Sequence, residues 1–236
     1  MQKKLYRVEL DNVEFNKSFD TKNTNYGKSF DFTSHYIFLT TYLEVMKQND
    51  ISVDFLVSLN NHICSIGNIY LEKVSKAIVD EYFVDINKVT DNAKHKNQRI
   101  SLKHINYFIA SLDDRNSFKE FLNGIYLWEY LLEFVRLNFF KEAPQRLDSV
   151  FFFKDIDSCN YYIQEHLSGI GKIYEVAIIN EISYFEGDMK IIDNVENQIK
   201  FEDLVNEFAD YWRGKLTLAP VKEIIFQGTY KYIKEL

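Results

Sequence analysis

The chain has 236 residues, of which 46% are hydrophobic and 27% are charged, so it can bury a sizeable core as one large domain or two small ones. This composition excludes an intrinsically disordered chain. The formal net charge of −7 excludes a protein coated with basic surface for duplex nucleic acid, although a local cationic cleft is compatible with it.

Cys64 and Cys159 are far apart in the chain, which predicts neither a disulfide framework nor a zinc knuckle and fits a reducing compartment. Charges interrupt the apolar residues of the opening segment MQKKLYRVELDNVEF, unlike the continuous apolar core of a signal peptide. No uncharged stretch reaches the roughly 18 residues that a membrane span needs. We therefore expect a cytoplasmic protein without a membrane partner.

The first predicted element is a strand over residues 4–10, where Leu5, Arg7 and Glu9 alternate with Tyr6, Val8 and Leu10. Residues 12–34 are rich in polar side chains without sustained periodicity, which predicts a loop.

Helical spacing dominates residues 35–140, which we interpret as an all-helical insertion after the first strand. A polar and basic break at 91–99 predicts a connection between two helical hairpins. The apolar positions that define the helices are Tyr36, Leu39, Leu43 and Met46, then Phe55, Leu59, Ile63, Ile66 and Ile69, and finally Phe121, Ile125, Trp128, Leu131, Leu132, Val135 and Phe139.

After Pro144 the pattern changes to strands, so residues 1–34 and 141–236 are predicted to form one β-rich scaffold of mixed α+β class. One helix is expected from Asp157 or Ser158 to Leu167, and another carries Phe201, Leu204, Val205, Phe208 and Trp212 and ends at Gly214. The predicted strands are 149–153, 171–180, 182–192 with a turn at Glu186-Gly187-Asp188, and 222–233.

Familiar catalytic signatures are absent from the sequence, including Gly-rich phosphate loops, H-E-x-x-H and G-x-S-x-G. The histidines show no spacing typical of metal ligands, so no metal site is predicted; they are His35, His62, His95, His104 and His166.

Three segments combine polar and apolar residues in a way that a purely structural strand does not require. Arg7 lies inside the first predicted strand. Arg146 and Ser149 precede the apolar run Val150 to Phe153, and Glu223 opens the apolar strand Glu223-Ile224-Ile225-Phe226.

The order Arg7, Ser149, Glu223 resembles the mono-ADP-ribosyltransferase superfamily, in which a first strand carries Arg or His after an aromatic residue, a middle strand carries Ser or Tyr, and a late strand carries a catalytic Glu. The resemblance covers residues 4–10 and about 144–233. It implies a split β-sandwich that binds NAD between its sheets. The segment from Glu223 to Phe226 is most similar to toxin-type members that modify DNA or RNA, including those of toxin–antitoxin and phage-defence systems.

The resemblance implies that Glu223 stabilises the oxocarbenium-like transition state of nicotinamide release and that Arg7, with Arg146 as a second candidate, binds the NAD phosphates. Ser149 would anchor the nicotinamide ribose or orient Glu223. The remaining candidates for NAD binding are Tyr6 and Val8 beside Arg7, and Phe151, Phe152, Phe153 or Tyr230 as the residue that stacks on nicotinamide.

Two departures from the family pattern affect the expected substrate. Val8 stands where many members have Gly after the first-strand Arg, and its backbone can still contact the nicotinamide amide. Val221 stands where arginine-modifying members carry Glu or Gln, so arginine is not the expected acceptor. A nucleic acid is preferred to a protein as acceptor, and an antitoxin or chaperone is expected to restrain the protein.

Structural readings of the same residues remain open. Arg7 fits a surface ion pair, Ser149 a hydroxyl at the start of a strand, and Glu223 a solvated strand end. The basic run Lys94, Lys96, Arg99 and Lys103 fits a solvated connection or a nucleic-acid contact. A non-enzymatic interaction module is therefore the alternative function. The enzyme hypothesis requires that Arg7, Ser149 and Glu223 converge on one cleft between two small sheets.

Overall fold

The computed structural model describes residues 4–29, 43–53, 83–85, 99–101, 125–196 and 198–236. The chain divides into two compact units. The first comprises Met1–Asp31, Leu132–Asn194 and Glu207–Leu236, and the second comprises Phe32–Leu131 and Val195–Asn206.

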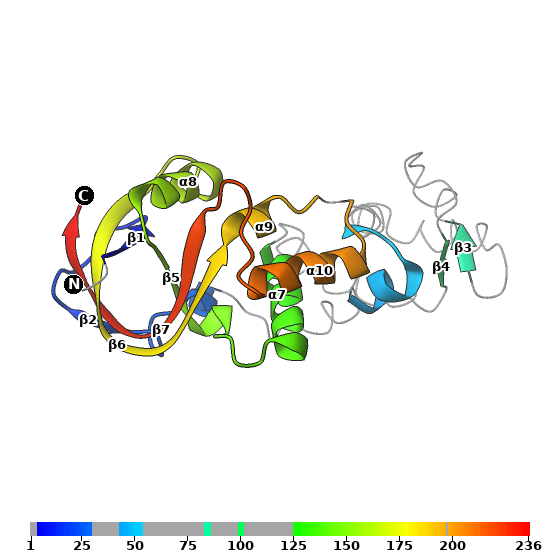
Figure 1. The fold of residues 1–236 in the computed structure, drawn as a ribbon, viewed down its shortest axis with the longest axis horizontal. Helices are drawn as coiled ribbons and strands as arrows, with labels where there is room; N and C mark the ends of the chain where they lie inside the picture. Colours follow the sequence, from blue (N-terminus) through cyan, green and yellow to red (C-terminus); the bar gives the residue numbers. More distant parts are fainter. Residues whose placement is uncertain (1–3, 30–42, 54–82, 86–98, 102–124, 197) are drawn as a thin grey trace, which may run out of the picture. The chain divides into compact units, whose positions relative to one another are not determined.

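The first unit is built on an antiparallel sheet of five strands, in the order β2-β7-β5-β1-β6. Because β6 also pairs with β7, the strands β7, β5, β1 and β6 form a closed ring, which is visible in Figure 1. The mixed α+β class predicted from the sequence is confirmed. The strand bounds are Leu5–Glu9 for β1, Ser18–Asp20 for β2, Val150–Phe153 for β5, Lys172–Asp188 for β6 and Lys222–Glu235 for β7.

The larger core cluster lies on one face of this sheet, because alternate side chains of a strand point to the same side. Phe152 of β5 contacts Phe226 and Tyr230 of β7, with ring centroids 5.2 and 5.1 Å apart. The cluster consists of Leu5, Val150, Phe152, Tyr174, Val176, Ile224, Phe226, Tyr230 and Tyr232, all at most 3% exposed.

A second core cluster lies on the opposite face, where α8 (Ile156–His166) packs. This helix begins after Asp155, whose side chain accepts a hydrogen bond from the Ser158 backbone N–H at 2.7 Å, two to three residues earlier than the predicted cap. The cluster comprises Val8, Phe153, Cys159, Ile163, Met189 and Val221. Burial raises the pKa of the Cys159 thiol to about 12, so this free cysteine behaves as a core residue.

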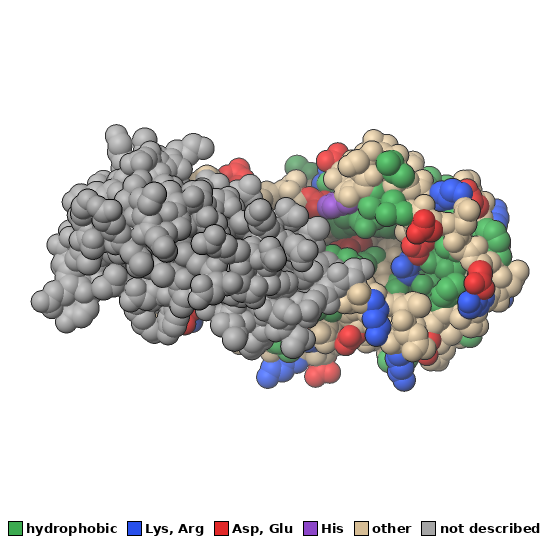
Figure 2. Space-filling view, turned by 180° about the vertical axis from the view of Figure 1, so that it is seen from behind, with side chains coloured by type: hydrophobic (Ala, Val, Ile, Leu, Met, Phe, Trp, Pro, Cys, Tyr) green, Lys and Arg blue, Asp and Glu red, His purple; other side chains and the backbone are tan. Residues whose placement is uncertain are grey.

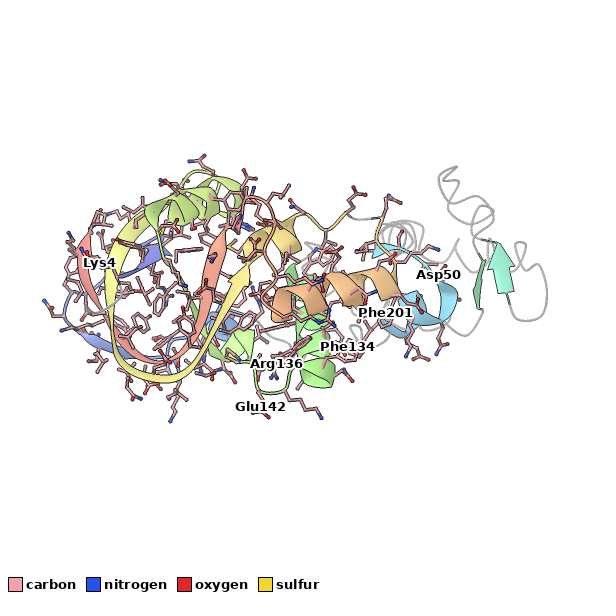
Figure 3. All side chains as sticks on the ribbon, in the orientation of Figure 1. Lys4, Asp50, Phe134, Arg136, Glu142 and Phe201 are labelled. Atoms are coloured by element: carbon pink, nitrogen blue, oxygen red, sulfur yellow. The ribbon has the colours of Figure 1, made fainter. Side chains whose placement is uncertain are left out.

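Three more helices contribute to the described part of the chain. α9 (Met189–Asp193) follows β6, α10 is Phe201–Trp212, and α7 is Ile125–Phe139. α10 ends before Gly214, whose φ of +71° suits the predicted C-terminal glycine. Near the end of α7, the Arg136 guanidinium donates to the carbonyl oxygens of Lys141 and Ala143 at 3.3 and 3.0 Å and so fixes the following turn (Figure 3).

The second unit corrects the prediction of an all-helical insertion. β3 (Phe83–Asp85) and β4 (Arg99–Ser101) form an antiparallel two-stranded sheet, and β4 begins inside the segment predicted as a connection. Strands of three residues are too short to show a period-2 pattern, which explains why the sequence did not reveal them. The apolar positions Phe55 to Ile69, Phe121, and the basic residues Lys94, Lys96 and Lys103 lie outside the described residues.

Two predictions within the scaffold are also wrong. The predicted loop 12–34 contains β2 and the 3-10 turn η1 (Tyr26–Ser29), because Phe19 packs against Tyr230 and Tyr232. The predicted turn at 186–188 does not form: β6 continues to Asp188, and the chain then enters α9. Gly187 serves a packing purpose instead.

Over the described part of the chain, no helix is long and apolar enough to cross a membrane.

Candidate functional site

Glu223 lies at the start of β7, where it is the backbone partner of Phe153 on β5 and of Gly187 on β6. The residue is 4% exposed, so its carboxylate is held inside the protein although it opens a strand. The interpretation of Glu223 as a solvated strand end is therefore wrong. A buried carboxylate must be paired and hydrogen-bonded, or its burial is strongly unfavourable.

Arg146 and Tyr211 provide that pairing. Arg146 belongs to the 3-10 turn η4 (Arg146–Asp148), and its Nη1 donates to Glu223 Oε1 at 2.9 Å and to the Tyr211 hydroxyl at 2.8 Å. The Tyr211 hydroxyl in turn donates to the same Oε1 at 2.6 Å. The Arg146 guanidinium also lies over the Phe151 ring, 4.7 Å from its centroid. These contacts form a closed triangle around a single carboxylate oxygen.

Gly187 explains how the Tyr211 ring reaches Glu223. A Cβ atom at position 187 would lie 2.4 Å from Tyr211 Cε2, far inside contact distance, so only glycine leaves room for the ring beside β6. The ring is also held by Phe185, at a centroid distance of 5.6 Å, and by Trp212 at 5.2 Å. Tyr211 is consequently fixed by packing as well as by hydrogen bonds.

The second carboxylate oxygen of Glu223 differs from the first. Among the described residues, none donates a hydrogen bond to Oε2, whereas Oε1 accepts two. Leaving a buried acceptor without a donor costs about 1–3 kcal/mol, and more when the acceptor is charged. Such an atom is well suited to a hydroxyl or N–H group of a ligand.

Arg7 takes part in a different set of contacts. Its Nη1 donates to the Tyr230 hydroxyl at 2.7 Å, and its Nε lies 2.5 Å from Glu9 Oε1. Glu9 also accepts a hydrogen bond from Tyr232. Tyr230 and Tyr232 belong to the larger core cluster, so Arg7 lies on the face of the sheet opposite Glu223. No direct contact joins the two predicted catalytic residues.

Tyr162 on α8 links the two sets electrostatically. Burial raises the pKa of the Tyr162 phenol, Glu223 and Glu9 raise it further, and Arg7 and Arg146 oppose the increase. Coulombic effects of this kind weaken steeply with distance in a solvated protein. The two ion pairs therefore lie within electrostatic reach of one phenol.

Ser149 adopts a structural role in this conformation. The residue is 0% exposed, and its hydroxyl donates to the Gln145 carbonyl at 2.6 Å, which stabilises the η4 turn. Its own carbonyl accepts from the Tyr26 N–H at 2.9 Å. Ser149 thus positions Arg146 through the backbone of the turn and has no contact with Glu223 of its own.

The other residues proposed to bind NAD differ in how far their side chains are exposed. Phe153, Tyr230 and Val8 are core residues at 2%, 1% and 9%, as is Phe152 at 0%. Tyr6 and Phe151 are half-buried; Tyr6 packs against the cluster beneath α8, and Phe151 contacts Tyr26 and Arg146.

A lysine cluster borders the start of β7. Glu186 accepts from Lys154, and Lys222 Nζ lies 3.2 Å from its Oε1. Burial acts to raise the pKa of Glu186, but the hydrogen bonds from the two lysines outweigh it and the pKa lies below its usual value. On the face shown in Figure 2, basic and acidic side chains are interspersed over the described part, with hydrophobic side chains gathered between them.

The residues that sequence reasoning missed are Tyr211, Tyr162 and Gly187. Tyr211 lies between Phe208 and Trp212 of the predicted apolar stripe, and an aromatic residue with a polar tip at this position is not distinguishable from a core residue by spacing. In the described residues, no group of three or more His, Cys, Asp or Glu side chains is placed to hold a metal ion.

His166, at the end of α8, pairs with Asp193, at the end of α9, and this pair predicts how the stability of the protein depends on pH. Its Nε2 lies 3.2 Å from Asp193 Oδ2, which also accepts from Tyr161 at 3.0 Å. The hydrogen bond to Asp193 raises the pKa of His166 above 6.5 despite the opposing effect of burial, and Asp193, Glu223 and Glu165 add to the increase.

A raised pKa means that the folded state binds the proton more tightly, so the stabilisation is fully present below pH 6.5 and is lost as the pH rises through the folded-state pKa. We expect native protein to exceed a His166→Gln variant in unfolding free energy at pH 6, and the difference to shrink by pH 9. Urea unfolding at both pH values measures it. A difference that stays constant with pH would contradict the ion pair.

A family model described as "Protein of unknown function (DUF2441)" matches residues 6–236. The search of curated proteins gave no match.

Proposed function

Because the chain belongs to the DUF2441 family, whose description assigns no activity, we propose a function from the site itself: an NAD-dependent mono-ADP-ribosyltransferase in which Glu223 is the catalytic carboxylate. The observation that carries the proposal is the difference between the two oxygens of the buried Glu223 carboxylate: Oε1 accepts two hydrogen bonds, and none of the described residues donates one to Oε2. The ribose hydroxyl of NAD supplies the donor that Oε2 lacks.

The reaction requires a buried negative charge beside the ribose. The bond between nicotinamide and ribose C1′ breaks, and its electron pair leaves with neutral nicotinamide. C1′ develops positive charge until an acceptor nucleophile, which loses a proton, forms the new bond. A carboxylate fixed in a low-dielectric site stabilises that charge without reorganisation. The hydrogen bonds from Arg146 and Tyr211 hold the Glu223 carboxylate in place while it does so.

The two arginines suit the dinucleotide phosphates. A guanidinium offers several donors in a planar fork, which matches phosphate oxygens. Arg146 contacts Glu223 directly, whereas Arg7 lies on the opposite face of the sheet, so we assign phosphate binding to Arg146 first and keep Arg7 as the second candidate. Tyr162, a half-buried ring on α8 whose centroid lies 5.4 Å from that of Phe153, replaces the buried Phe153 and Tyr230 as the candidate ring for stacking on nicotinamide.

The fold supports the finer assignment to a split β-sandwich. β6 and β7 are long and curved, and each pairs with different partners at its two ends: β6 with β1 near Lys172, and β7 with β5 near Lys222 and with β2 near Tyr230. The antiparallel pair of β6 and β7 thus supplies strands to both sides of the ring. We propose that NAD binds between these two sides.

We propose a nucleic acid as the acceptor and the cytosol as the place of action, as expected of a toxin that an antitoxin or chaperone restrains. Val221, two residues before Glu223, is 8% exposed and offers no carboxylate for an arginine substrate. Lys154 and Lys222 both pair with Glu186, and they are the described basic groups next in sequence to Phe153 and Glu223. Phosphate groups of an acceptor would compete with Glu186 for these two lysines.

Nicotinamide release from NAD tests the proposal. We expect a Glu223→Gln variant to lose at least about 100-fold in rate, because the amide keeps the shape and the acceptor oxygen but not the charge that stabilises C1′. Glu175→Gln is the matched control. Glu175 lies in the same row of paired residues, beyond Phe153 and Tyr6, and its ion-pair partners in the described part of the chain are the exposed Lys4 and Lys234. Its rate should equal that of native protein.

Expression in cells tests the toxin assignment with the same variants. Native protein and Glu175→Gln should arrest growth, whereas Glu223→Gln should be tolerated, and labelled NAD added to lysate should mark nucleic acid only with active protein. Label on arginine side chains would contradict the acceptor. If native protein releases no nicotinamide and labels nothing, the non-enzymatic interaction module becomes the preferred function. The exposed side chains of Leu216 and Leu218, at 54% and 108%, favour that alternative.

A further inference from the structure

The contacts of Glu223 assign a role to a residue outside all three predicted segments. We propose that Tyr211 is the positioning residue of this site: its hydroxyl holds Oε1 of Glu223 and thereby directs Oε2 to the ribose of NAD. This role rests on the proposed function and explains what orients the Glu223 carboxylate.

The direction of the hydrogen bonds follows from chemistry. Arg146 has donors only, so the Tyr211 hydroxyl must accept from Nη1 at 2.8 Å and give its own proton to Glu223 Oε1 at 2.6 Å. Arg146 Nη1 adds a second donor to the same oxygen at 2.9 Å. Both donors therefore act on Oε1, and rotation of the carboxylate would break both of them.

Packing fixes the hydroxyl more firmly than hydrogen bonds alone would. The ring lies against Gly187, where no side chain fits, and against Phe185. Its neighbour Trp212 donates from Nε1 to the Leu132 carbonyl at 3.1 Å and so secures the end of α10. Tyr211 is 0% exposed. A donor that is held in this way needs no reorganisation when charge develops at the ribose.

Tyr211→Phe removes only the hydroxyl and leaves the ring in its space. We expect kcat for nicotinamide release to fall about 10- to 100-fold with KM for NAD changed less than about 2-fold, because a hydrogen bond to a charged group is lost from the transition state while the contacts with the rest of NAD remain. The matched control is Tyr174→Phe, another fully buried tyrosine, whose hydroxyl makes a long 3.5 Å bond to the Asp11 carbonyl. It should retain native kinetics.

A double variant separates positioning from general damage. If the hydroxyl acts through the Glu223 carboxylate, Tyr211→Phe should change the residual rate of the Glu223→Gln protein by less than about 2-fold. An equal fall in both backgrounds would indicate a structural effect and overturn the role, as would a Tyr211→Phe protein with native kcat. If native protein releases no nicotinamide, the proposed function fails and this role fails with it. The two failures are thus distinguishable.

Discussion

Replacing Arg146 with methionine is expected to lower the free energy of unfolding by about 3–5 kcal/mol, because the change removes the only described cation that is in contact with a 4% exposed carboxylate. Methionine keeps much of the side-chain length and apolar contact with Phe151, so lost packing contributes little. The remaining Tyr211 hydroxyl cannot compensate a full negative charge. Urea unfolding at pH 7 measures the loss.

The control is Arg213→Met. Arg213 also pairs with a carboxylate, Asp210 at 2.7 Å, but its side chain is 53% exposed, so we expect a loss below about 1 kcal/mol. A double variant in which Arg146→Met is combined with Glu223→Leu should recover most of the stability, since it removes the buried charge as well. If Arg146→Met costs no more than Arg213→Met, the Arg146–Glu223 pair does not stabilise the fold.

Substituting Gly228 with alanine is expected to cost more than about 4 kcal/mol. A Cβ atom at this position would lie 2.1 Å from the carbonyl oxygen of Asn180 and 2.8 Å from the Phe226 ring, and φ is +145°, a conformation that L-residues rarely adopt. The first overlap is with backbone, so no rotamer change relieves it. The site lies where β6 changes register against β7, on either side of Glu181.

Gly169→Ala separates the overlap from the backbone conformation. Gly169 also has a positive φ, +81°, but a Cβ there would approach no atom closer than the Gln164 Oε1 at 3.7 Å. Its cost should be about 1–2 kcal/mol, the usual penalty of the left-handed region alone. Thermal unfolding of both variants measures the two losses of stability. Equal losses would mean that the β6–β7 strand pair shifts to accommodate a methyl group at position 228.

Elements with a strong local pattern were predictable from the sequence. The alternation from Leu5 to Glu9 became β1, the apolar run after Ser149 became β5, and the stripe ending at Gly214 became α10. In each case the side-chain period matches the geometry of a single element. Glu223 could be singled out as a candidate because a carboxylate that opens an apolar strand is conspicuous without any knowledge of its partners.

What depends on contacts between distant segments was not predictable. Gly187 reads as a turn residue because its packing against Tyr211, 24 positions later, leaves no local pattern. Arg7 and Glu223 were expected to converge on one cleft because their order resembles that of a known family. The strand register places their side chains on opposite faces of the sheet, and register depends on pairing between distant parts of the chain. The hydroxyl of Tyr211 acquires its role only when α10 packs beside β7.

The closed ring of strands also determines when the first unit can complete its fold. Arg7 and Tyr230, which are hydrogen-bonded in the folded protein, are 223 residues apart in the chain, and β5 borders β7 only after both have been made. At roughly 5–20 residues per second, a ribosome releases β1 some ten seconds or more before its partners on β7. During synthesis the strand edges stay open and Glu223 has not yet met Arg146. High contact order thus delays completion of the ring until β7 has been made.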